Sequence, residues 1–248
     1  MRTPLDGQRL LVFGATGGVG RAVCAEARAA GARLHLCARG ADDLAALAAQ
    51  LEASHTVGDV TDGASVEAVV QAAKAALGGI DGVVLAVGSV VLKPAHRTSD
   101  DDWAATRAVN LDAALYVVRS AAKAMMRSGG GNIVLFSTAA AQAGVPNHAA
   151  IAAAKAGVEG LVRATAATYA SRGLRINAIA PGLVETPLTA RITGNEAARA
   201  ASEKMHGLGR IGDPDDIAHA VRFLLESTWT TGQVLVVDGG LSGVKGGR

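Results

Sequence analysis

The feature that most constrains the fold is an alternation, along the whole chain, of short apolar runs and longer, alanine-rich stretches with helical periodicity. This alternation is typical of repeated βα units, in which each crossover helix packs against a parallel sheet. Right-handed crossovers place helices on both faces of such a sheet. We therefore predict one α/β domain with a doubly wound, seven-stranded parallel sheet.

The short apolar runs are the predicted strands, and the stretches between them are the predicted helices. Strands are expected at Arg9–Phe13, Arg33–Cys37, His55–Val57, Gly82–Ala86, Asn132–Ser137, Arg175–Ile179 and Gln233–Val237. Helices are expected near 18–30, 42–51, 63–77, 99–126, 148–171 and 213–226. No linker-like stretch or internal repeat divides the 248 residues, so the predicted domain spans 1–248. The least regular stretch is 182–212, and we expect a substrate lid within it, at 183–206.

Composition and charge exclude several classes of protein. Lys and Arg total 24 against 22 Asp and Glu, and no basic stripe is present, so nucleic acid is not an expected partner. The apolar runs are shorter than the roughly 20 residues that span a bilayer, and the first residues lack a signal-peptide core. Cys24 and Cys37 are too few for a disulfide framework, and the six histidines lack metal-ligand spacing. We expect a cytoplasmic protein that binds no metal and no membrane.

A glycine cluster follows the first predicted strand directly. It reads Gly14-Ala15-Thr16-Gly17-Gly18-Val19-Gly20, and helical periodicity begins at once at Arg21. Glycines let a backbone turn tightly and approach a pyrophosphate, whose charge is met by free N–H groups at the start of the helix. A tight turn without a ligand is the alternative interpretation. The position at the first strand-to-helix turn favours a dinucleotide site.

The end of the second predicted strand indicates which dinucleotide is preferred. About 20 residues after the glycine cluster, an acidic residue commonly binds the ribose hydroxyls of NAD. Here the chain reads Ala38-Arg39, and a guanidinium matches the oxygens of a 2′-phosphate. The alternative is an ordinary surface arginine. We therefore expect NADP(H) to be preferred, with NAD(H) possible.

Taken together, these motifs resemble those of the short-chain dehydrogenase/reductase family, especially its members that reduce 3-oxoacyl thioesters and related ketones. The matching segments are Gly14 to Gly20, Asp59-Val60, Val109-Asn110, Asn177 to Gly182, Thr186 and the stretch Thr231 to Gly240, although Phe13 stands where Thr is usual. The resemblance implies a Rossmann-type fold. It assigns cofactor binding to Gly14, Thr16, Gly18, Val19, Gly20, Arg39, Asp59, Val60, Gly88, Asn110, Lys155, Pro181, Gly182, Val184 and Thr186.

The catalytic positions depart from the family pattern. The family uses a Ser that orients the substrate carbonyl, a Tyr that exchanges the proton, and a Lys one helical turn after the Tyr. Lys155 matches the lysine, but Ile151 stands in the tyrosine position and Thr138 in the serine position. The tyrosines of this chain, Tyr116 and Tyr169, fit neither position. The loop Leu85-Ala86-Val87-Gly88 also differs from the family's Asn-Asn-Ala-Gly.

Other residues are therefore candidates for the proton chemistry. Thr138 can donate a hydrogen bond to a developing oxyanion, with Ser137 as the alternative donor. His148 lies two helical turns before Lys155, and this spacing is similar to the Tyr-x6-Lys arrangement of enoyl-thioester reductases in the same superfamily. A histidine at that point can act as a general acid, or it can be a solvent-facing residue at the helix start. In the family, the Asn110 position anchors a water connected to the lysine.

The leading hypothesis is an NADP(H)-dependent oxidoreductase that acts on a carbonyl or hydroxyl group of a small molecule, with Asn110, Thr138, Lys155 and His148 at its catalytic end. One alternative is a catalytically weak dinucleotide-binding protein, or a regulatory partner of an active homologue. Another is an enoyl reductase that uses His148. The resemblance also implies a homotetramer packed through the helices near 99–126 and 148–171 and through the last strand.

Overall fold

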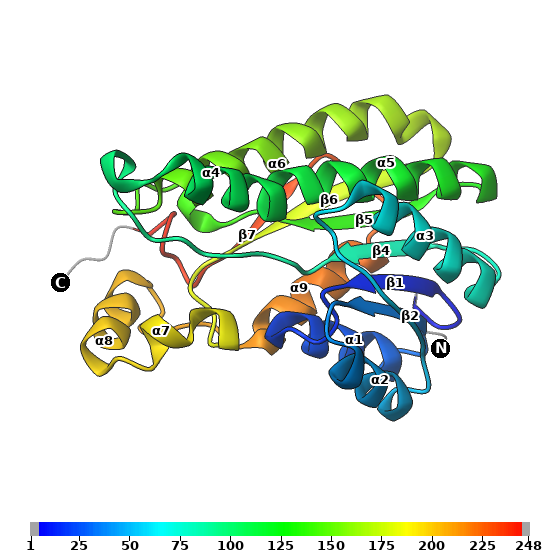
Figure 1. The fold of residues 1–248 in the computed structure, drawn as a ribbon, viewed down its shortest axis with the longest axis horizontal. Helices are drawn as coiled ribbons and strands as arrows, with labels where there is room; N and C mark the ends of the chain where they lie inside the picture. The colour runs from blue at the N-terminus through cyan, green and yellow to red at the C-terminus, as the bar shows by residue number, and fades with distance from the viewer. Residues whose placement is uncertain (1–4, 245–248) are drawn as a thin grey trace.

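A computed structural model describes residues 5–244, whose strands form one parallel sheet (Figure 1). The strands lie in the order β3-β2-β1-β4-β5-β6-β7, so the chain starts near the middle of the sheet and winds outward in both directions. The predicted seven-stranded doubly wound sheet is confirmed. The strands are β1 Arg9–Phe13, β2 Arg33–Ala38, β3 Ser54–Val57, β4 Gly82–Leu85, β5 Gly131–Phe136, β6 Leu174–Pro181 and β7 Val234–Val237.

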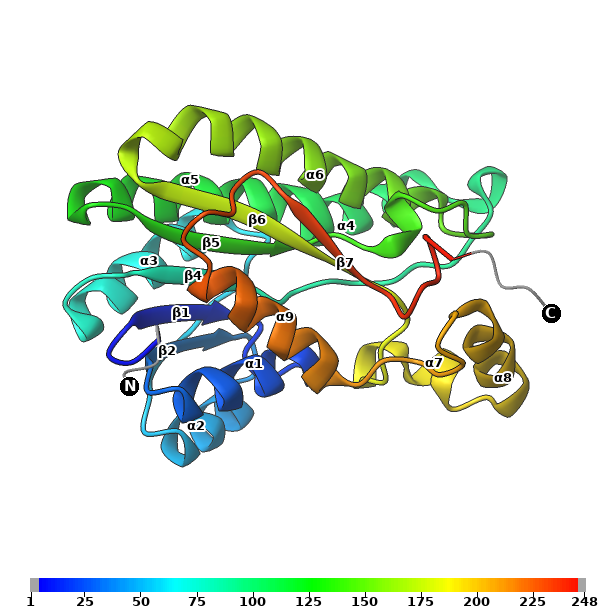
Figure 2. The same cartoon turned by 180° about the vertical axis from the view of Figure 1, so that it is seen from behind.

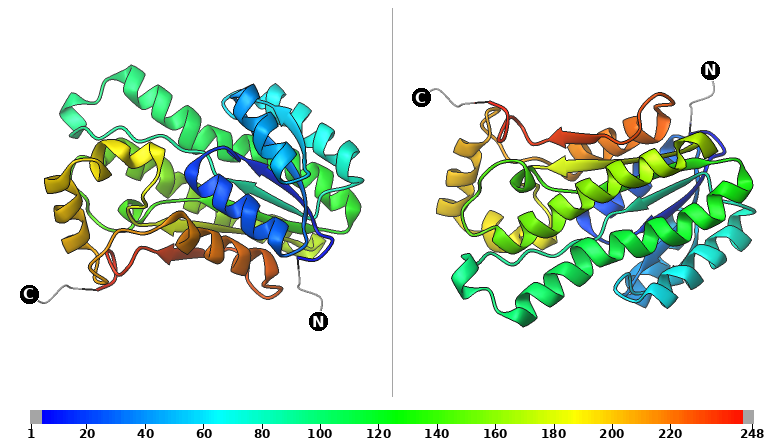
Figure 3. Two further views of the ribbon diagram at one scale, coloured as in Figure 1. Left: turned by 90° about the horizontal axis from the view of Figure 1, so that it is seen from below. Right: turned by 90° about the horizontal axis from the view of Figure 1, so that it is seen from above.

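Helices cover both faces of the sheet. In Figures 1 and 2, α3, α5 and α6 lie over one face, and α1, α2 and α9 lie over the other. Figure 3 shows α5 and α6 running alongside each other. The helices are α1 Gly18–Ala29, α2 Ala41–Gln50, α3 Gly63–Leu77, α4 Asp100–Arg107, α5 Ala113–Met125, α6 Ala149–Tyr169, α7 Ala190–Thr193, α8 Glu196–Met205 and α9 Pro214–Glu226.

The core consists of two apolar layers separated by the sheet. Successive side chains of β1 point to opposite layers: Leu11 and Phe13 pack with α3, α5 and α6, whereas Leu10 and Val12 pack with α1 and α9. All four are at most 1% exposed. Because both faces of the strands are buried, the strands are nearly continuous apolar runs, which is why the sequence reveals them so clearly. Functional polar groups are therefore expected at the strand ends.

An ion pair ties together the amino ends of two central strands. The guanidinium of Arg9, the first residue of β1, donates from Nε to Oδ2 of Asp81 at 2.8 Å and from a terminal nitrogen to Oδ1 at 2.5 Å. The backbone N–H of Arg9 also donates to Asp81, at 2.9 Å. Asp81 directly precedes β4, and the hydrogen bond from the Arg9 side chain is the main cause that lowers the pKa of the carboxyl.

The helical segment predicted near 99–126 is present, and a π-helical turn interrupts its regular hydrogen bonding. This turn, Ala108–Asp112, separates α4 from α5 and carries Asn110. The side-chain Nδ2 of Asn110 donates to the carbonyl of Thr106 at 2.9 Å. In a regular α-helix that carbonyl would accept the backbone N–H of Asn110 itself. Turns of this kind are frequent at functional sites.

The stretch 182–212 is more regular than predicted. It contains a 3₁₀ turn at Pro187–Thr189 and two helices, α7 and α8. The side chain of Asn195 caps α8 by accepting the N–H of Ala198 at 2.9 Å. Figure 1 shows α7 and α8 beyond the carboxyl ends of the strands, away from the two core layers. This position is consistent with a lid, whose role remains a prediction.

Both cysteines are buried free thiols. Burial raises the pKa values of Cys24 and Cys37 to about 12, so both stay protonated at neutral pH. Within residues 5–244, no three His, Cys, Asp or Glu side chains are grouped to hold a metal ion. Over the same residues, no helix combines the length and apolarity that crossing a bilayer requires.

We expect Asp81→Asn to lower the free energy of unfolding by about 1–3 kcal/mol, because the charged Arg9 side chain would lose its partner while it stays partly buried. Urea unfolding at pH 7 measures the change. Glu67→Gln is the matched control, since its 3.0 Å pair with Lys123 is exposed and should contribute at most about 1 kcal/mol. Equal losses in the two variants would contradict the role given to Asp81.

Candidate active site

A cavity of about 510 Å³ lies at the carboxyl end of the sheet. It is lined by the segments that follow β1, β2, β3, β4, β5 and β6, and by side chains of the π-helical turn and α6. β1 lies between β2 and β4, and the crossover from β1 to β2 runs in the opposite direction to the crossover from β4 to β5, so the direction changes between β1 and β4. In doubly wound sheets, ligands bind outside the carboxyl ends of the strands at this switch point.

The turn after β1 can be made only by glycine at two positions. Gly14 has φ +76°, and a Cβ there would lie 2.5 Å from the carbonyl oxygen of Ala86. A Cβ at Gly20 would lie 2.0 Å from the carbonyl oxygen of Gly14. Gly14 lines the cavity and Gly20 does not. The role of Gly20 is therefore to let the loop close tightly on α1.

The amino end of α1 faces the cavity. Gly17 is its N-cap and has no side chain to satisfy the first amides, and Gly18 and Val19 of the first turn line the cavity. The first N–H groups of a helix have no partner within the helix, and the helix dipole adds positive potential there. A Cβ at Gly18 would lie 2.8 Å from Cγ2 of Thr186, so this glycine also lets the segment after β6 approach the loop.

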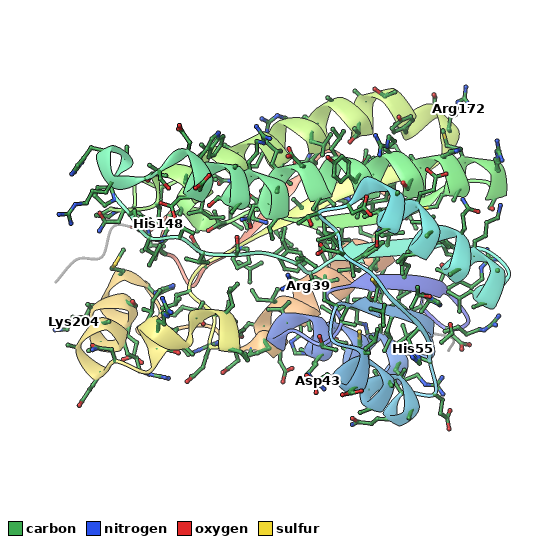
Figure 4. The ribbon with its side chains drawn as sticks, in the orientation of Figure 1. Arg39, Asp43, His55, His148, Arg172 and Lys204 are labelled. Atoms are coloured by element: carbon green, nitrogen blue, oxygen red, sulfur yellow. The ribbon has the colours of Figure 1, made fainter. Side chains whose placement is uncertain are left out.

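One end of the cavity carries a free guanidinium. Arg39, which is labelled in Figure 4, directly follows β2, is exposed and lines the cavity. Asp59 lies after β3, and its Oδ1 accepts the N–H of Thr61 at 2.9 Å and the hydroxyl of Thr61 at 2.8 Å. These bonds are the main cause that lowers the pKa of Asp59, and Arg39 contributes less. Val60 is buried beside them.

The other end of the cavity contains Lys155 and Asn110. A Cβ at Gly88 would lie 3.3 Å from Oδ1 of Asn110 and 4.0 Å from Nζ of Lys155, so the three residues meet at one point. The side chain of Asn110 binds Ser89: Nδ2 donates to the Ser89 hydroxyl at 2.9 Å, and Oδ1 accepts the Ser89 N–H at 3.2 Å. Burial lowers the pKa of Lys155 to about 8.

Thr138, Ser137 and Ile151 line the same end. Oγ1 of Thr138 accepts the N–H of Ala140 at 3.3 Å, which leaves the hydroxyl proton free to be donated. The hydroxyl of Ser137 donates to Oε1 of Glu159 at 2.8 Å. Ile151 is 5% exposed and presents only carbon atoms to the cavity.

Like Gly20, the two tyrosines and His148 lie outside the cavity lining. Tyr116 on α5 and Tyr169 at the end of α6 pack against the core layer under these helices. His148 precedes α6 as its N-cap, and its Nδ1 is 2.7 Å from the carbonyl oxygen of Pro146. Figure 4 shows His148 at the start of α6. Helix α6 therefore begins directly after His148, which does not line the cavity that contains Lys155.

The remaining predicted site residues all line one cavity. They are Gly14, Thr16, Gly18, Val19, Arg39, Asp59, Val60, Gly88, Asn110, Thr138, Lys155, Pro181, Gly182, Val184 and Thr186. Sequence reasoning missed Ser89 and Glu159. The position of Glu159, one helical turn after Lys155 on a helix assigned to the site, could have indicated that Glu159 lies near the site. No sequence signal indicated Ser89.

These observations define a class of protein. A doubly wound parallel sheet with a glycine-lined turn after its first strand, next to a helix amino end, is the architecture of dinucleotide-binding proteins. The residues fit such a ligand: the backbone at Gly14 and Gly18 leaves no room for a Cβ, and Arg39 and Lys155 place positive groups at the two ends of the cavity.

Comparison with known proteins identifies the family. Residues 14–242 match the family model described as enoyl-(acyl carrier protein) reductase. D-threitol dehydrogenase of Mycolicibacterium smegmatis is 36% identical over 243 residues, which cover 95% of this chain and 93% of that protein. 3-Oxoacyl-[acyl-carrier-protein] reductase of Thermotoga maritima is 33% identical over 244 residues, 96% of this chain and 98% of that protein. The chain belongs to the short-chain dehydrogenase/reductase family.

A solved structure shows the same fold. The gluconate 5-dehydrogenase of Burkholderia cenocepacia, in complex with NADP and tartrate, superposes with a TM-score of 0.92 and is 32% identical, and the match covers 97% of each chain. The Rossmann-type fold expected from the sequence is therefore confirmed.

The low pKa of Lys155 predicts how stability depends on pH. The lysine titrates near pH 8 in the folded protein and near 10.5 in the unfolded chain, which binds more protons between these values. The free energy of unfolding should therefore rise between pH 8 and 10.5, by up to about 1.4 kcal/mol per pH unit from this group. Urea unfolding at several pH values should give a smaller increase with pH for Lys155→Met than for the wild type. The exposed control Lys123→Met, which keeps Lys155, should retain the wild-type increase. Parallel curves for the wild type and Lys155→Met would contradict the assignment.

Proposed function

We propose that this protein is an NADP(H)-dependent oxidoreductase that interconverts a hydroxyl and a carbonyl group with an atypical active site. The observation that carries the proposal is that a single cavity joins the glycine turn and Arg39 at one end to Thr138 and Lys155 at the other. The first pair suits the phosphates of a dinucleotide, and the second pair suits a reacting oxygen.

The preference for NADP(H) rests on Arg39. Its guanidinium is exposed at the cavity, where it can pair with a 2′-phosphate through two parallel hydrogen bonds. Among the described residues that line the cavity, the carboxylate is that of Asp59, and one of its oxygens is already occupied by Thr61. The similar gluconate 5-dehydrogenase, which is in complex with NADP, supports the same preference.

The end of the cavity near Thr138 favours a neutral substrate. Ile151 beside it is apolar, and Val90, Val184 and Leu188 add apolar side chains to the lining of the same cavity. Lys155 is the charged group at this end, and its desolvation disfavours the charge. The names of the relatives, D-threitol dehydrogenase and gluconate 5-dehydrogenase, support alcohol and ketone chemistry for this chain.

The residues have distinct parts in the reaction. When bound, the nicotinamide supplies or accepts the hydride. Thr138 can donate a hydrogen bond to the substrate oxygen, because its own oxygen accepts from Ala140. Asn110 and Ser89 fix the loop at Gly88, next to the ammonium of Lys155. Ile151 holds the substrate by van der Waals contact and has no proton to give.

Two other functions are less well supported. Reduction of an enoyl group with His148 as the acid needs that side chain in the cavity, whereas its Nδ1 is bound to Pro146 and it does not line the cavity. Nucleotide binding without turnover is favoured by the apolar Ile151 in the position of the family's tyrosine. Turnover of bound nucleotide with any alcohol or ketone excludes this second function.

Arg39→Ala should weaken NADPH binding about 10- to 100-fold and leave NADH binding nearly unchanged, because a charge-assisted bidentate pair to the 2′-phosphate is lost. Fluorescence titration of the purified protein with each nucleotide measures both affinities. Arg172→Ala is the matched control, since Figure 4 shows Arg172 at the far end of α6. Equal loss for NADPH and NADH would show that Arg39 does not bind the 2′-phosphate.

Replacement of Ile151 should reveal the effect of a proton donor at that position. We expect Ile151→Tyr to increase the rate of ketone reduction at least about 10-fold, because a phenol next to Lys155 adds general acid catalysis. Ile151→Phe adds the same ring without the hydroxyl and should give no increase. Steady-state rates with NADPH and cyclohexanone compare the two. Equal rates for Tyr and Phe would contradict the role of this position.

A further inference from the structure

We propose that Glu159 accepts the proton released by the substrate alcohol, and that Ser137 passes this proton on. The proposal rests on the proposed function, since it concerns the same site. Glu159 lies on α6 one turn after Lys155 and is only 9% exposed. Its Oε1 accepts the hydroxyl of Ser137 at 2.8 Å and Nε2 of Gln142 at 3.1 Å. Glu159 itself does not line the cavity, whereas Ser137 does.

The carboxylate fixes the direction of the Ser137 hydroxyl. A hydroxyl has one proton to donate and two lone pairs that accept. An ionised carboxylate only accepts, so the Ser137 proton points to Glu159. The free side of Ser137 Oγ toward the cavity can therefore only accept a hydrogen bond. A buried serine that faces a carboxylate in this way is an acceptor for a substrate O–H group.

Thr138 has the opposite polarity. Its Oγ1 accepts the N–H of Ala140, and its hydroxyl proton is free. The two consecutive residues at the end of β5 thus offer one donor and one acceptor to the same cavity. An alcohol oxygen needs both: it accepts from Thr138 and donates to Ser137. This pair supplies the two contacts that orient a hydroxyl for oxidation.

The proton transfer balances without further reactants. The O–H bond of the substrate breaks, and its proton moves to Ser137 Oγ while the Ser137 proton moves to Oε1 of Glu159. The carbinol C–H bond supplies the hydride that the oxidised nicotinamide of the proposed function takes up. The substrate is thereby oxidised to a ketone, Ser137 regains its hydroxyl, and Glu159 becomes a neutral acid. Gln142, which is exposed, donates to the same oxygen and stabilises the ionised carboxylate before the transfer.

Glu159→Gln separates proton transfer from structure. The amide oxygen of Gln can still accept from Ser137 and Gln142, but it cannot take up a proton. With NADP⁺ and cyclohexanol, 2-butanol or D-threitol, we expect kcat to fall about 10²-fold or more while KM changes less than about 2-fold. Glu159→Asp, which keeps a carboxylate, should recover part of the rate. Glu67→Gln on the exposed surface of α3 is the matched control and should retain the wild-type rate.

Binding of 1-methylcyclohexanol, a tertiary alcohol without a transferable hydride, provides a readout independent of turnover. Calorimetry of the nucleotide-bound protein should give the wild-type dissociation constant for Glu159→Gln and a roughly 5- to 10-fold weaker one for Ser137→Ala, which loses the acceptor. Ser137→Ala should also lose about as much of kcat as Glu159→Gln. If Glu159→Gln does not fold, Ser137→Ala decides by itself.

The outcomes separate this inference from the proposed function. A Glu159→Gln protein that folds and turns over within about 2-fold of the wild type overturns the proton path and leaves the oxidoreductase intact. Unchanged alcohol binding in Ser137→Ala overturns the role of Ser137 as acceptor. If the wild type oxidises none of the three alcohols, the proposed function fails, and the proton path fails with it.

Discussion

Burial of the parallel sheet on both faces is the constraint on which the rest of the structure depends. The two apolar layers leave no room for polar chemistry along the strands, so functional side chains are confined to the strand ends. At the carboxyl edge, β1 ends in the glycine turn, β2 in Arg39 and β5 in Ser137 and Thr138. The cavity is the place where these ends meet, and its residues come from segments far apart in the sequence.

Helix α6 brings the chemistry to this edge. Ile151, Lys155 and Glu159 follow one another at intervals of one turn, so they share one face of the helix. The first part of this face, with Ile151 and Lys155, lines the cavity. Glu159, one turn further on, is buried and contacts the cavity only through its hydrogen bond with Ser137. In the proposed function, this helix contacts the substrate through Ile151, carries the cationic group of Lys155 and holds the carboxylate of Glu159 behind Ser137.

Much of this arrangement could be predicted from the sequence, because periodicity and glycine chemistry are local signals. The limits of β1 and α3 agree with the prediction, and the glycine turn lies where it was expected. The π-helical turn at Asn110 leaves no trace in the periodicity, because it depends on a side chain that replaces a backbone hydrogen bond. Ser137 follows a strand and Glu159 lies on a helix. Periodicity within one element therefore does not predict the contact between them. His148 is the N-cap of α6 and lies outside the cavity lining, and sequence spacing alone does not distinguish this position from one on the helix.

The pair of Arg9 and Asp81 lies at the amino ends of β1 and β4, and the cavity lies at the carboxyl edge of the same sheet. The ion pair that links these two strands is thus separated from the cavity by the length of the strands. Substitutions at the carboxyl edge can change specificity without weakening the ion pair of Arg9 and Asp81. Substitutions at the amino edge can raise or lower stability without changing the shape of the cavity. A chain organised in this way can exchange its catalytic groups over evolutionary time while its fold persists.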